Sequence, residues 1–285
     1  MTSATALPQR RLSRRGRIGP RLRGRRWLAA GLILIGVLVA AGVLVPLFTG
    51  SPTTAHPDQA LLGPSGSHLF GTDRYGRDVF VRTISAIRID LVLALVAAAG
   101  AFVVGSVVGA VSGLLGGYVD EVVMRITDIM MAFPSFVLAL MVTASLGNST
   151  GHALIGVAAA YVPHFIRLTR ARALSVRSLD FVAASRVART GKLRIAFEHV
   201  LPNAIQPALV QATLVSAWAI IDIAGLSFLG VGVQPPTPEW GAMIADGYGD
   251  ILSGQWWTAF FPGLFIILAA TGFHLAGDAL DGSDR

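Results

Sequence analysis

The sequence predicts an all-α, polytopic membrane protein with six transmembrane helices and both termini in the cytoplasm. Of its 285 residues, 53% are hydrophobic and only 14% are charged, whereas about a quarter of the residues of a typical soluble domain are charged. The apolar residues gather into six long runs, and the basic residues concentrate in segments between them. A soluble domain could not cover so many apolar runs with so few polar residues.

The N-terminal segment, residues 1–26, is predicted to be a cytoplasmic tail. Nine arginines fall within residues 10–26, eight more basic residues fall within 167–194, and none lies within 204–284. Because Lys and Arg are enriched in the cytoplasmic loops of membrane proteins, this asymmetry predicts the orientation of the chain. It also accounts for the net charge of +7, so no nucleic-acid partner is expected.

The first apolar run, residues 27–48, predicts the first transmembrane helix. As a helix it would be about 33 Å long, which is enough to cross a hydrocarbon core of about 30 Å. The apolar region of a cleaved signal peptide is only about 7 to 15 residues long, so a retained helix is the preferred interpretation. An external loop is expected to follow at residues 49–90.

Residues 91–277 are predicted to form a core domain with five more transmembrane helices. These helices are expected at residues 91–115, 126–146, 153–168, 204–225 and 257–276. A cytoplasmic loop at 169–203 separates the last two of them from the others, and residues 278–285 form a cytoplasmic tail. Within the second run, Gly105 and Gly109 form a GxxxG motif, which permits close packing against another helix.

No catalytic or metal site is expected in this chain. It has no cysteine, no GxxxxGK[ST] phosphate-binding loop, no HExxH zinc motif and no GxSxG nucleophile motif, so it is not expected to bind ATP or another cofactor itself. Ionisable residues are scarce in the apolar runs, where Asp222 lies near the outer end of its run and His164 and His274 are interpreted as solitary. Transporters driven by protons usually keep such groups within the bilayer, so the energy for transport is expected to come from elsewhere.

A basic, amphipathic insert, FVAASRVARTGKLRIAFEHVLPN, occupies residues 181–203 between two apolar runs. Its pattern predicts two short helices that meet at Thr190 and Gly191. Pro202 lacks a backbone N–H and is expected to end the second helix. From the residues alone the insert could be a connector, an interfacial helix or a docking element for a cytoplasmic partner.

The insert resembles the cytoplasmic "EAA" loop of the permeases of ABC importers. The family pattern is matched at its opening by Ala184, Ser185 and Arg186, and at its close by Ile195, His199, Leu201, Pro202 and Asn203. Two positions differ, because Ala183 replaces the usual glutamate and Arg189 replaces the usual glycine, with Gly191 two places later. The resemblance implies an ATPase-docking loop that comprises Phe181, Val182, Ala183, Ala184, Ser185, Arg186, Arg189, Gly191, Phe197 and His199.

Further stretches resemble signatures of the dipeptide, oligopeptide and nickel branch of this family, and of its second, C-type permeases in particular. They are HLFGTDRYGRDVFVR at 68–82, MRITDIMMAFPSFVLAL at 124–140, LSFLGVGVQPPTPEWGAMI at 226–244 and GDALD at 277–281. The external residues singled out by these stretches are Asp73, Arg77, Asp78, Gln234, Pro235, Pro236 and Trp240.

The chemistry of the external residues favours structural roles. Asp73, Arg74, Arg77 and Asp78 could pair with one another, and an ion-pair network is preferred to a substrate site. The prolines of QPPTP stiffen their loop, which is either a rigid cap over the helices or a contact for a protein that delivers substrate. Trp240 is expected at the membrane interface or in a protein contact.

The resemblance implies a type I ABC importer permease fold and a non-catalytic subunit in the plasma membrane of a prokaryote. The implied partners are a second permease that completes a heterodimer, two ATPase subunits that bind ATP and Mg²⁺, and an external substrate-binding protein. Short peptides are the expected substrate, with nickel, glutathione or another small solute as alternatives, and the residues that line the pathway are unknown. A stand-alone secondary transporter is the alternative from another class.

Overall fold

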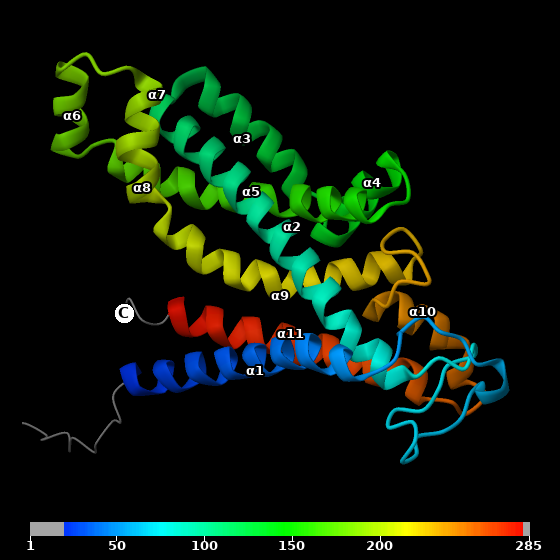
Figure 1. The fold of residues 1–285 in the computed structure, drawn as a ribbon. Helices are drawn as coiled ribbons and strands as arrows, with labels where there is room; N and C mark the ends of the chain where they lie inside the picture. The colour runs from blue at the N-terminus through cyan, green and yellow to red at the C-terminus, as the bar shows by residue number, and fades with distance from the viewer. Residues whose placement is uncertain (1–19, 282–285) are drawn as a thin grey trace, which may run out of the picture.

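The computed structural model describes residues 20–281 and is helical apart from its connecting segments and an isolated antiparallel bridge between Thr72 and Asp78 (Figure 1). The helices are α1 (Pro20–Phe48), α2 (Val79–Leu115), α3 (Gly117–Met131), α4 (Ser135–Leu146), α5 (Thr150–Val176), α6 (Asp180–Val187), α7 (Lys192–Ile195), α8 (Leu201–Ala204), α9 (Gln206–Phe228), α10 (Trp240–Ile251) and α11 (Trp257–Asp281), with a 3₁₀ turn η1 (Pro57–Gln59) and a π turn η2 (Ala196–Val200). Most of the predicted N-terminal tail and the end of the C-terminal tail lie outside the described residues.

The longest helix, α2, packs closely against α5 at the centre of the fold. A methyl group added at Gly105 would meet the side chain of Phe165, and one added at Gly109 would meet the carbonyl oxygen of Ile166. Both glycines of the GxxxG motif therefore face α5 of the same chain, where only the absence of a side chain allows the two backbones to approach.

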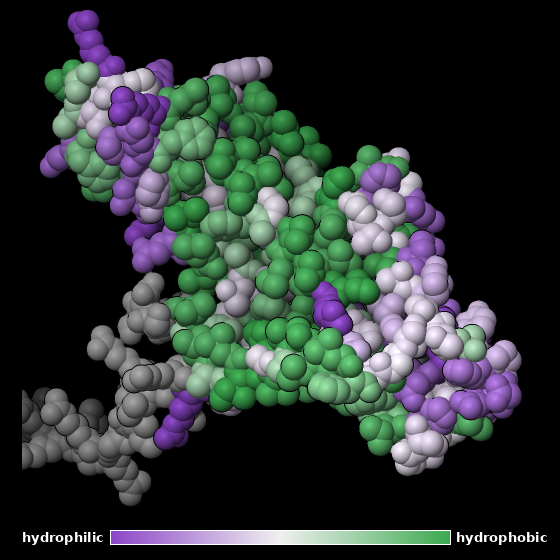
Figure 2. Space-filling model, in the orientation of Figure 1, coloured by the Kyte–Doolittle hydropathy of each residue, from purple (hydrophilic) through white to green (hydrophobic). Residues whose placement is uncertain are grey.

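The surface divides into an apolar middle and two hydrophilic ends (Figure 2). Large apolar side chains such as Val92, Leu95 and Val103 on α2 are exposed along the middle. Apolar surface of this extent needs lipid or protein to cover it. The chain is accordingly a multi-pass membrane protein.

Four helical stretches among the described residues are long and apolar enough to cross a bilayer, namely Arg26–Phe48, Val79–Leu115, Gln206–Phe228 and Trp257–Leu280. Helices α3 and α4 pass the same test only as a pair, bent by 97° at the break between them, and would add a fifth crossing if the pair is one span. Helix α5 is not among these stretches. Six crossings therefore stay a prediction.

Several predicted helix boundaries are wrong, since α1 begins at Pro20 and not at residue 27, and α5 ends at Val176 and not at residue 168. The second apolar helix begins at Val79 and not at residue 91, so the external loop ends at Asp78, whose side chain caps the helix by accepting a hydrogen bond from the N–H of Val81 (3.0 Å). The polar residues of its first turns, which suggested a loop, have partners within the fold: for example, Arg88 Nε donates to the carbonyl oxygen of Gly42 (2.7 Å).

The run predicted as one helix at 126–146 is two helices. The chain bends between Met131 and Ser135, and Pro134 immediately precedes α4. A residue that precedes proline is disfavoured in the α conformation, and proline itself cannot donate a backbone hydrogen bond. The proline therefore separates an amphipathic α3 from a short apolar α4.

The insert forms an elbow, which we define as residues 180–204. Its helices α6 and α7 are separated at residues 188–191, as predicted. The prediction that Pro202 ends the second helix is wrong, because helical backbone continues through η2 and α8 to Ala204. Pro202 lies in the first turn of α8, where a backbone N–H is not needed.

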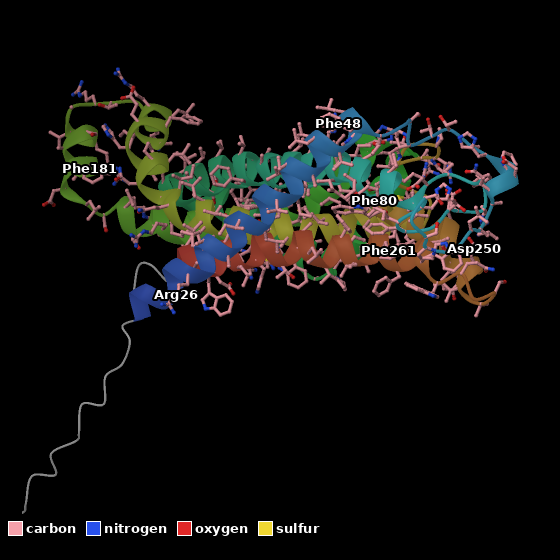
Figure 3. The ribbon with its side chains drawn as sticks, turned by 60° about the horizontal axis from the view of Figure 1, so that its bottom comes forward. Arg26, Phe48, Phe80, Phe181, Asp250 and Phe261 are labelled. Atoms are coloured by element: carbon pink, nitrogen blue, oxygen red, sulfur yellow. The ribbon has the colours of Figure 1, made fainter. Side chains whose placement is uncertain are left out.

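The elbow and the segments that are predicted to be external occupy opposite ends of the molecule. The beginning of α1, the end of α11 and the elbow lie at one end in Figure 1, and the loop before α2 lies with α10 at the other. Figure 3 shows Arg26 and Phe181 at the first end and Asp250 at the second. We define the cap as residues 49–78 and 229–256. The two termini of the described chain thus share one side, and the charge asymmetry predicts that this side is cytoplasmic.

Candidate functional site

The elbow has a small apolar core of its own. Val182 of α6 is fully buried, and it lies in one cluster with Ile195, Ala196 and Val200 of the second helical segment. The same cluster includes residues near the ends of α2 and α5, namely Ala110, Leu114, Ala173 and Val176. Because packed cores resist deformation, a force on the elbow is passed to both helices.

Other apolar side chains of the elbow point away from this core. Phe181 is 41% exposed and Val187 is 84% exposed, and Ala183 and Ala184 are exposed beside them. The ring of Phe181 meets that of His199 edge-on, with 6.1 Å between centroids. Apolar groups that stay exposed outside the apolar belt are typical of a protein contact.

Val182 does not share this surface with the other residues predicted to dock on an ATPase. Its side chain packs against α2 and α5 of this chain. Phe197 is about half exposed, and Ser185 donates its hydroxyl hydrogen to the carbonyl oxygen of Phe181 (2.9 Å) within α6. The exposed face is therefore carried by Phe181, Val187 and Phe197, and Val182 anchors it.

A basic cavity of about 570 Å³ lies between the elbow and the ends of α2 and α5. It is lined by Leu114, Leu115, Arg177, Arg186, Thr190, Lys192 and Ile195. Arg177 Nη1 donates to the carbonyl oxygen of Gly113 (2.9 Å). Within residues 20–281, Arg186, Lys192 and the neighbouring Arg189 have no acidic partner. The elbow therefore presents cations that can accept acidic groups from another molecule.

The backbone of Arg189 explains why glycine is usual at this position in the family that the insert resembles. Arg189 has φ = 55°, in the left-handed region, where a side chain costs about 1 to 2 kcal/mol and glycine is favoured. Gly191 has φ = −61° and ψ = 142°, a conformation open to any residue. The left-handed turn of the elbow thus lies at Arg189, and Gly191 adopts a conformation that does not need glycine.

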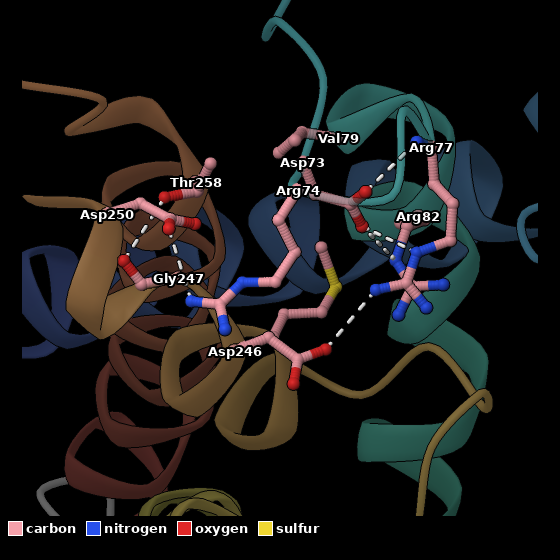
Figure 4. Close-up of a pocket in the computed structure, with 10 residues that line it drawn as sticks. Asp73, Arg74, Arg77, Val79, Arg82, Asp246, Gly247, Asp250 and Thr258 are labelled. Carbon is pink, nitrogen blue, oxygen red and sulfur yellow. Dashed lines mark hydrogen bonds and ion pairs between the residues drawn. The ribbon is translucent and has the colours of Figure 1, made fainter. Parts of the chain in front are cut away.

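At the opposite end, the charges of the cap are paired within the chain (Figure 4). Asp73 Oδ2 accepts a hydrogen bond from Arg77 Nε (2.6 Å), and Asp73 Oδ1 accepts from the backbone N–H of Tyr75 and of Arg77 (2.9 Å each). Arg77 Nη2 reaches Asp246 of α10 (3.2 Å). This arrangement joins the loop before α2 to α10.

The predicted pairing within the GTDRYGRD motif is correct for Asp73 and Arg77 but wrong for the other two residues. Arg74 Nη2 pairs with Asp250 of α10 (3.1 Å), and Asp78 pairs with Nδ1 of His68 (2.9 Å). The sequence carried no signal for Asp246 and Asp250, because they lie far along the chain from the arginines that they meet.

The proline loop is exposed but firmly attached. Gln234, Pro235 and Pro236 are exposed, with a cis peptide bond between the two prolines. The carbonyl oxygen of Pro236 accepts from Arg82 Nη1 (3.3 Å). Trp240, expected at an interface, is instead fully buried, and its Nε1 donates to the carbonyl oxygen of Thr83 (3.0 Å). The tryptophan anchors the loop and leaves the prolines exposed.

The ionisable residues of the apolar helices have partners as well. Asp222 accepts a hydrogen bond from the hydroxyl group of Tyr161 (2.8 Å), and the ring of His164 lies beside that tyrosine. His274 is 3.4 Å from Asp278. The interpretation of His164 and His274 as solitary is therefore wrong. In the described part of the chain, no group of three or more His, Asp or Glu side chains could hold a metal ion.

Comparisons with known proteins agree on one family. Residues 101–283 match the family described as binding-protein-dependent transport system inner membrane component. The dipeptide transport system permease protein DppC of Alkalihalophilus pseudofirmus is 41% identical over 88% of this chain and 82% of its own length. DppC of Escherichia coli is 43% identical over 76% of this chain and 72% of its own length. The probable D,D-dipeptide transport system permease protein DdpC of the same organism is 38% identical over 91% of this chain and 87% of its own length.

Proposed function

The chain belongs to the family of binding-protein-dependent transport system inner membrane components, and from this membership we propose that it is a permease subunit of an ATP-driven ABC importer for short peptides. Its relatives named as dipeptide and peptide transport permeases support this substrate class. The subunit forms half of the pathway in the plasma membrane of a prokaryote and performs no chemistry of its own.

The proposed partners follow from the same membership. A second permease completes the pathway, two ATPases bind and hydrolyse ATP with Mg²⁺, and an external binding protein delivers the peptide. The exposed proline loop at Gln234, Pro235 and Pro236 is the proposed contact for the binding protein, because a stiff loop loses little conformational entropy on docking.

The elbow couples the ATPases to the membrane helices, and its own apolar core is the observation that carries this proposal. The exposed face around Phe181 and Val187 docks on an ATPase, with Arg186 meeting acidic groups there. The elbow's core includes residues of α2 and α5, and α8 leads directly into α9. When ATP draws the ATPases together, the elbow moves as one body and tilts these three helices, which switches the pathway between its two faces.

The test is uptake of a labelled dipeptide by cells that express this chain with its partner subunits. Replacing residues 183–192 with a Gly/Ser linker should abolish ATP-dependent uptake. Val182 is kept in this variant, so the rest of the elbow stays packed against α2 and α5. The charge reversal Arg186→Glu should lower uptake without changing the amount of assembled complex. The matched control is Arg194→Glu, because Arg194 pairs with Glu198 on the exposed surface (2.8 Å) and does not line the basic cavity.

The outcomes separate the mechanism from the substrate. Uptake and ATPase coupling that survive changes at both Arg186 and residues 190–192 would refute the coupling role. If wild-type cells take up no dipeptide but do take up nickel or glutathione, the substrate class is wrong. If uptake needs no ATPase, the chain is a secondary transporter; copurification of ATPase subunits with the chain argues against that alternative.

A further inference from the structure

Two acidic side chains meet in the buried layer beneath the cap. Asp90 lies near the start of α2 and is 2% exposed, and Glu239 is the residue that caps α10 and is 0% exposed. They come from parts of the chain that are far apart in sequence. Two buried acids in contact need either a cation or a proton to compensate them.

The hydrogen bonds leave one oxygen of each acid without a donor. Asp90 Oδ2 accepts from the backbone N–H of Trp240 (3.2 Å), and Glu239 Oε2 accepts from that of Ala242 (2.7 Å). Asp90 Oδ1 and Glu239 Oε1 are buried and find no donor in the part of the chain that the structure covers. Trp240, whose backbone N–H binds Asp90, follows Glu239 directly in the chain, and this contact brings the two carboxyl groups together. Two acceptors can form a hydrogen bond with each other only when one of them carries a proton.

The charged groups on the surrounding elements do not neutralise the pair. On α2, Arg82 donates to carbonyl oxygens of Pro52 and Pro236, and Arg88 donates to that of Gly42. The remaining ionisable groups on the described helices packed here are engaged elsewhere, namely Asp222 on α9, Asp246 and Asp250 on α10, and His274 and Asp278 on α11. No described cation therefore offsets a second negative charge at this position.

The environment of Glu239 favours its neutral form. Burial raises the pKa of its carboxyl group above the ordinary 4.5 and outweighs four contacts that act in the opposite direction, namely the backbone N–H groups of Ala242 and Gly241 and the side chains of Asp90 and Ser227. A second carboxylate in contact adds to the cost of ionising both groups. The contact between the two carboxyl groups and their burial thus both favour retention of one proton by the pair.

We propose that Asp90 and Glu239 form a proton-binding site, in which one shared proton makes an O–H···O hydrogen bond between Asp90 Oδ1 and Glu239 Oε1. This bond ties α10 of the cap to α2. When the proton leaves to water, two adjacent negative charges remain buried, their repulsion loosens the cap, and the attachment of the cap becomes sensitive to the external pH.

The direction of the pH dependence follows from proton linkage. Above the ordinary pKa of these acids, the folded pair holds a proton that the unfolded chain has released. The free energy of unfolding therefore falls as the pH rises through the titration of the pair.

The direct test is infrared spectroscopy of the full chain with its partner permease in lipid nanodiscs. We expect the C=O stretch of a protonated carboxylic acid at neutral pH, and we expect it to disappear in Asp90→Asn, because the amide then supplies the donor and Glu239 ionises. Asp58→Asn is the matched control, since Asp58 is an exposed acid of the cap, and it should keep the band.

Thermal unfolding gives an independent readout. The wild-type melting temperature should fall as the buffer is made alkaline, and Asp90→Asn should remove that shift. If this variant does not fold, Glu239→Gln and the pH titration of the wild-type band test the same bond. Absence of the band at neutral pH, or a melting temperature that depends on sodium concentration at constant pH, would overturn the proposal in favour of a bound cation.

Discussion

The cap and the elbow both carry arginines, but they differ in how the charges are satisfied. In the cap, Arg74 and Arg77 each reach an aspartate of α10. In the elbow, Arg186 and Lys192 face a cavity, with no acidic partner among the residues of the described chain. The difference teaches that a basic motif has to be interpreted with its surroundings: paired arginines hold this chain together, whereas unpaired ones are available to another molecule.

The largest effect is expected from breaking the buried pairing of the cap. The Arg77 side chain is 7% exposed. Its removal in Arg77→Ala leaves the buried Asp73 with the more distant Arg82 (3.7 Å) and backbone N–H donors only, which should cost about 1 to 3 kcal/mol of stability. Arg74 is 40% exposed, so Arg74→Ala should cost about 1 kcal/mol at most. Thermal unfolding in nanodiscs measures both, and equal losses would show that burial does not distinguish the two arginines.

A gain in stability is expected at the elbow from Arg189→Gly. Relief of the left-handed conformation at φ = 55° should stabilise the elbow by about 1 to 2 kcal/mol. Gly191→Ala is the matched control, because nothing lies within 4 Å of a methyl group added at Gly191. Resistance of the elbow to limited proteolysis reports the change in stability. An Arg189→Gly variant that is less resistant than the wild type would contradict the presence of backbone strain at Arg189.

Removing the unpaired cations should affect association and leave stability almost unchanged. The double change Arg186→Gln and Lys192→Gln should alter stability by about 0.5 kcal/mol or less. It should weaken binding of the ATPase subunits and reduce the dependence of that binding on salt. Binding measured at two ionic strengths checks this expectation, which fails if the variant binds and responds to salt as the wild type does.

The smallest effect is expected where the elbow does have an ion pair. Arg194 Nε lies 2.8 Å from Glu198 Oε1, and both side chains are at least half exposed. Such a pair contributes about 0.3 to 0.5 kcal/mol, so Glu198→Gln should change thermal unfolding by no more than that amount. Unchanged peptide uptake would sharpen the contrast with Arg186, and a loss of uptake would place Glu198 in the docking surface.

Local signals in the sequence predicted a large part of the helical fold. The apolar runs located the helices, and Thr190 and Gly191 located the turn of the elbow. Two misplaced boundaries had signals that could have been used, since Pro134 marks the bend before α4 and Asp78 is a favourable capping residue before α2. Each of these signals depends on neighbouring residues alone and can therefore be recognised in the sequence.

Contacts between distant segments could not be predicted in this way. Asp246 and Asp250 gave no sign that they pair with the arginines before α2, and Gly105 could equally have faced lipid, another subunit or α5. The meeting of Asp90 with Glu239 depends on the same tertiary packing. Residue spacing describes one face of one helix, and it does not say which other helix that face meets.

Helix α2 has a mechanical consequence that follows from its length. Its 37 residues run without interruption from the cap to the elbow, so the helix is about 55 Å long. Its contact with α5 at Gly105 and Gly109 lies between the two ends and can act as a fulcrum. This contact is about 12 Å from the elbow end of the helix and about 42 Å from its cap end, so a rotation of about 10° about it carries the two ends through about 2 Å and about 7 Å. A small stroke at the elbow end is therefore delivered as a larger displacement, in the opposite sense, beneath the cap.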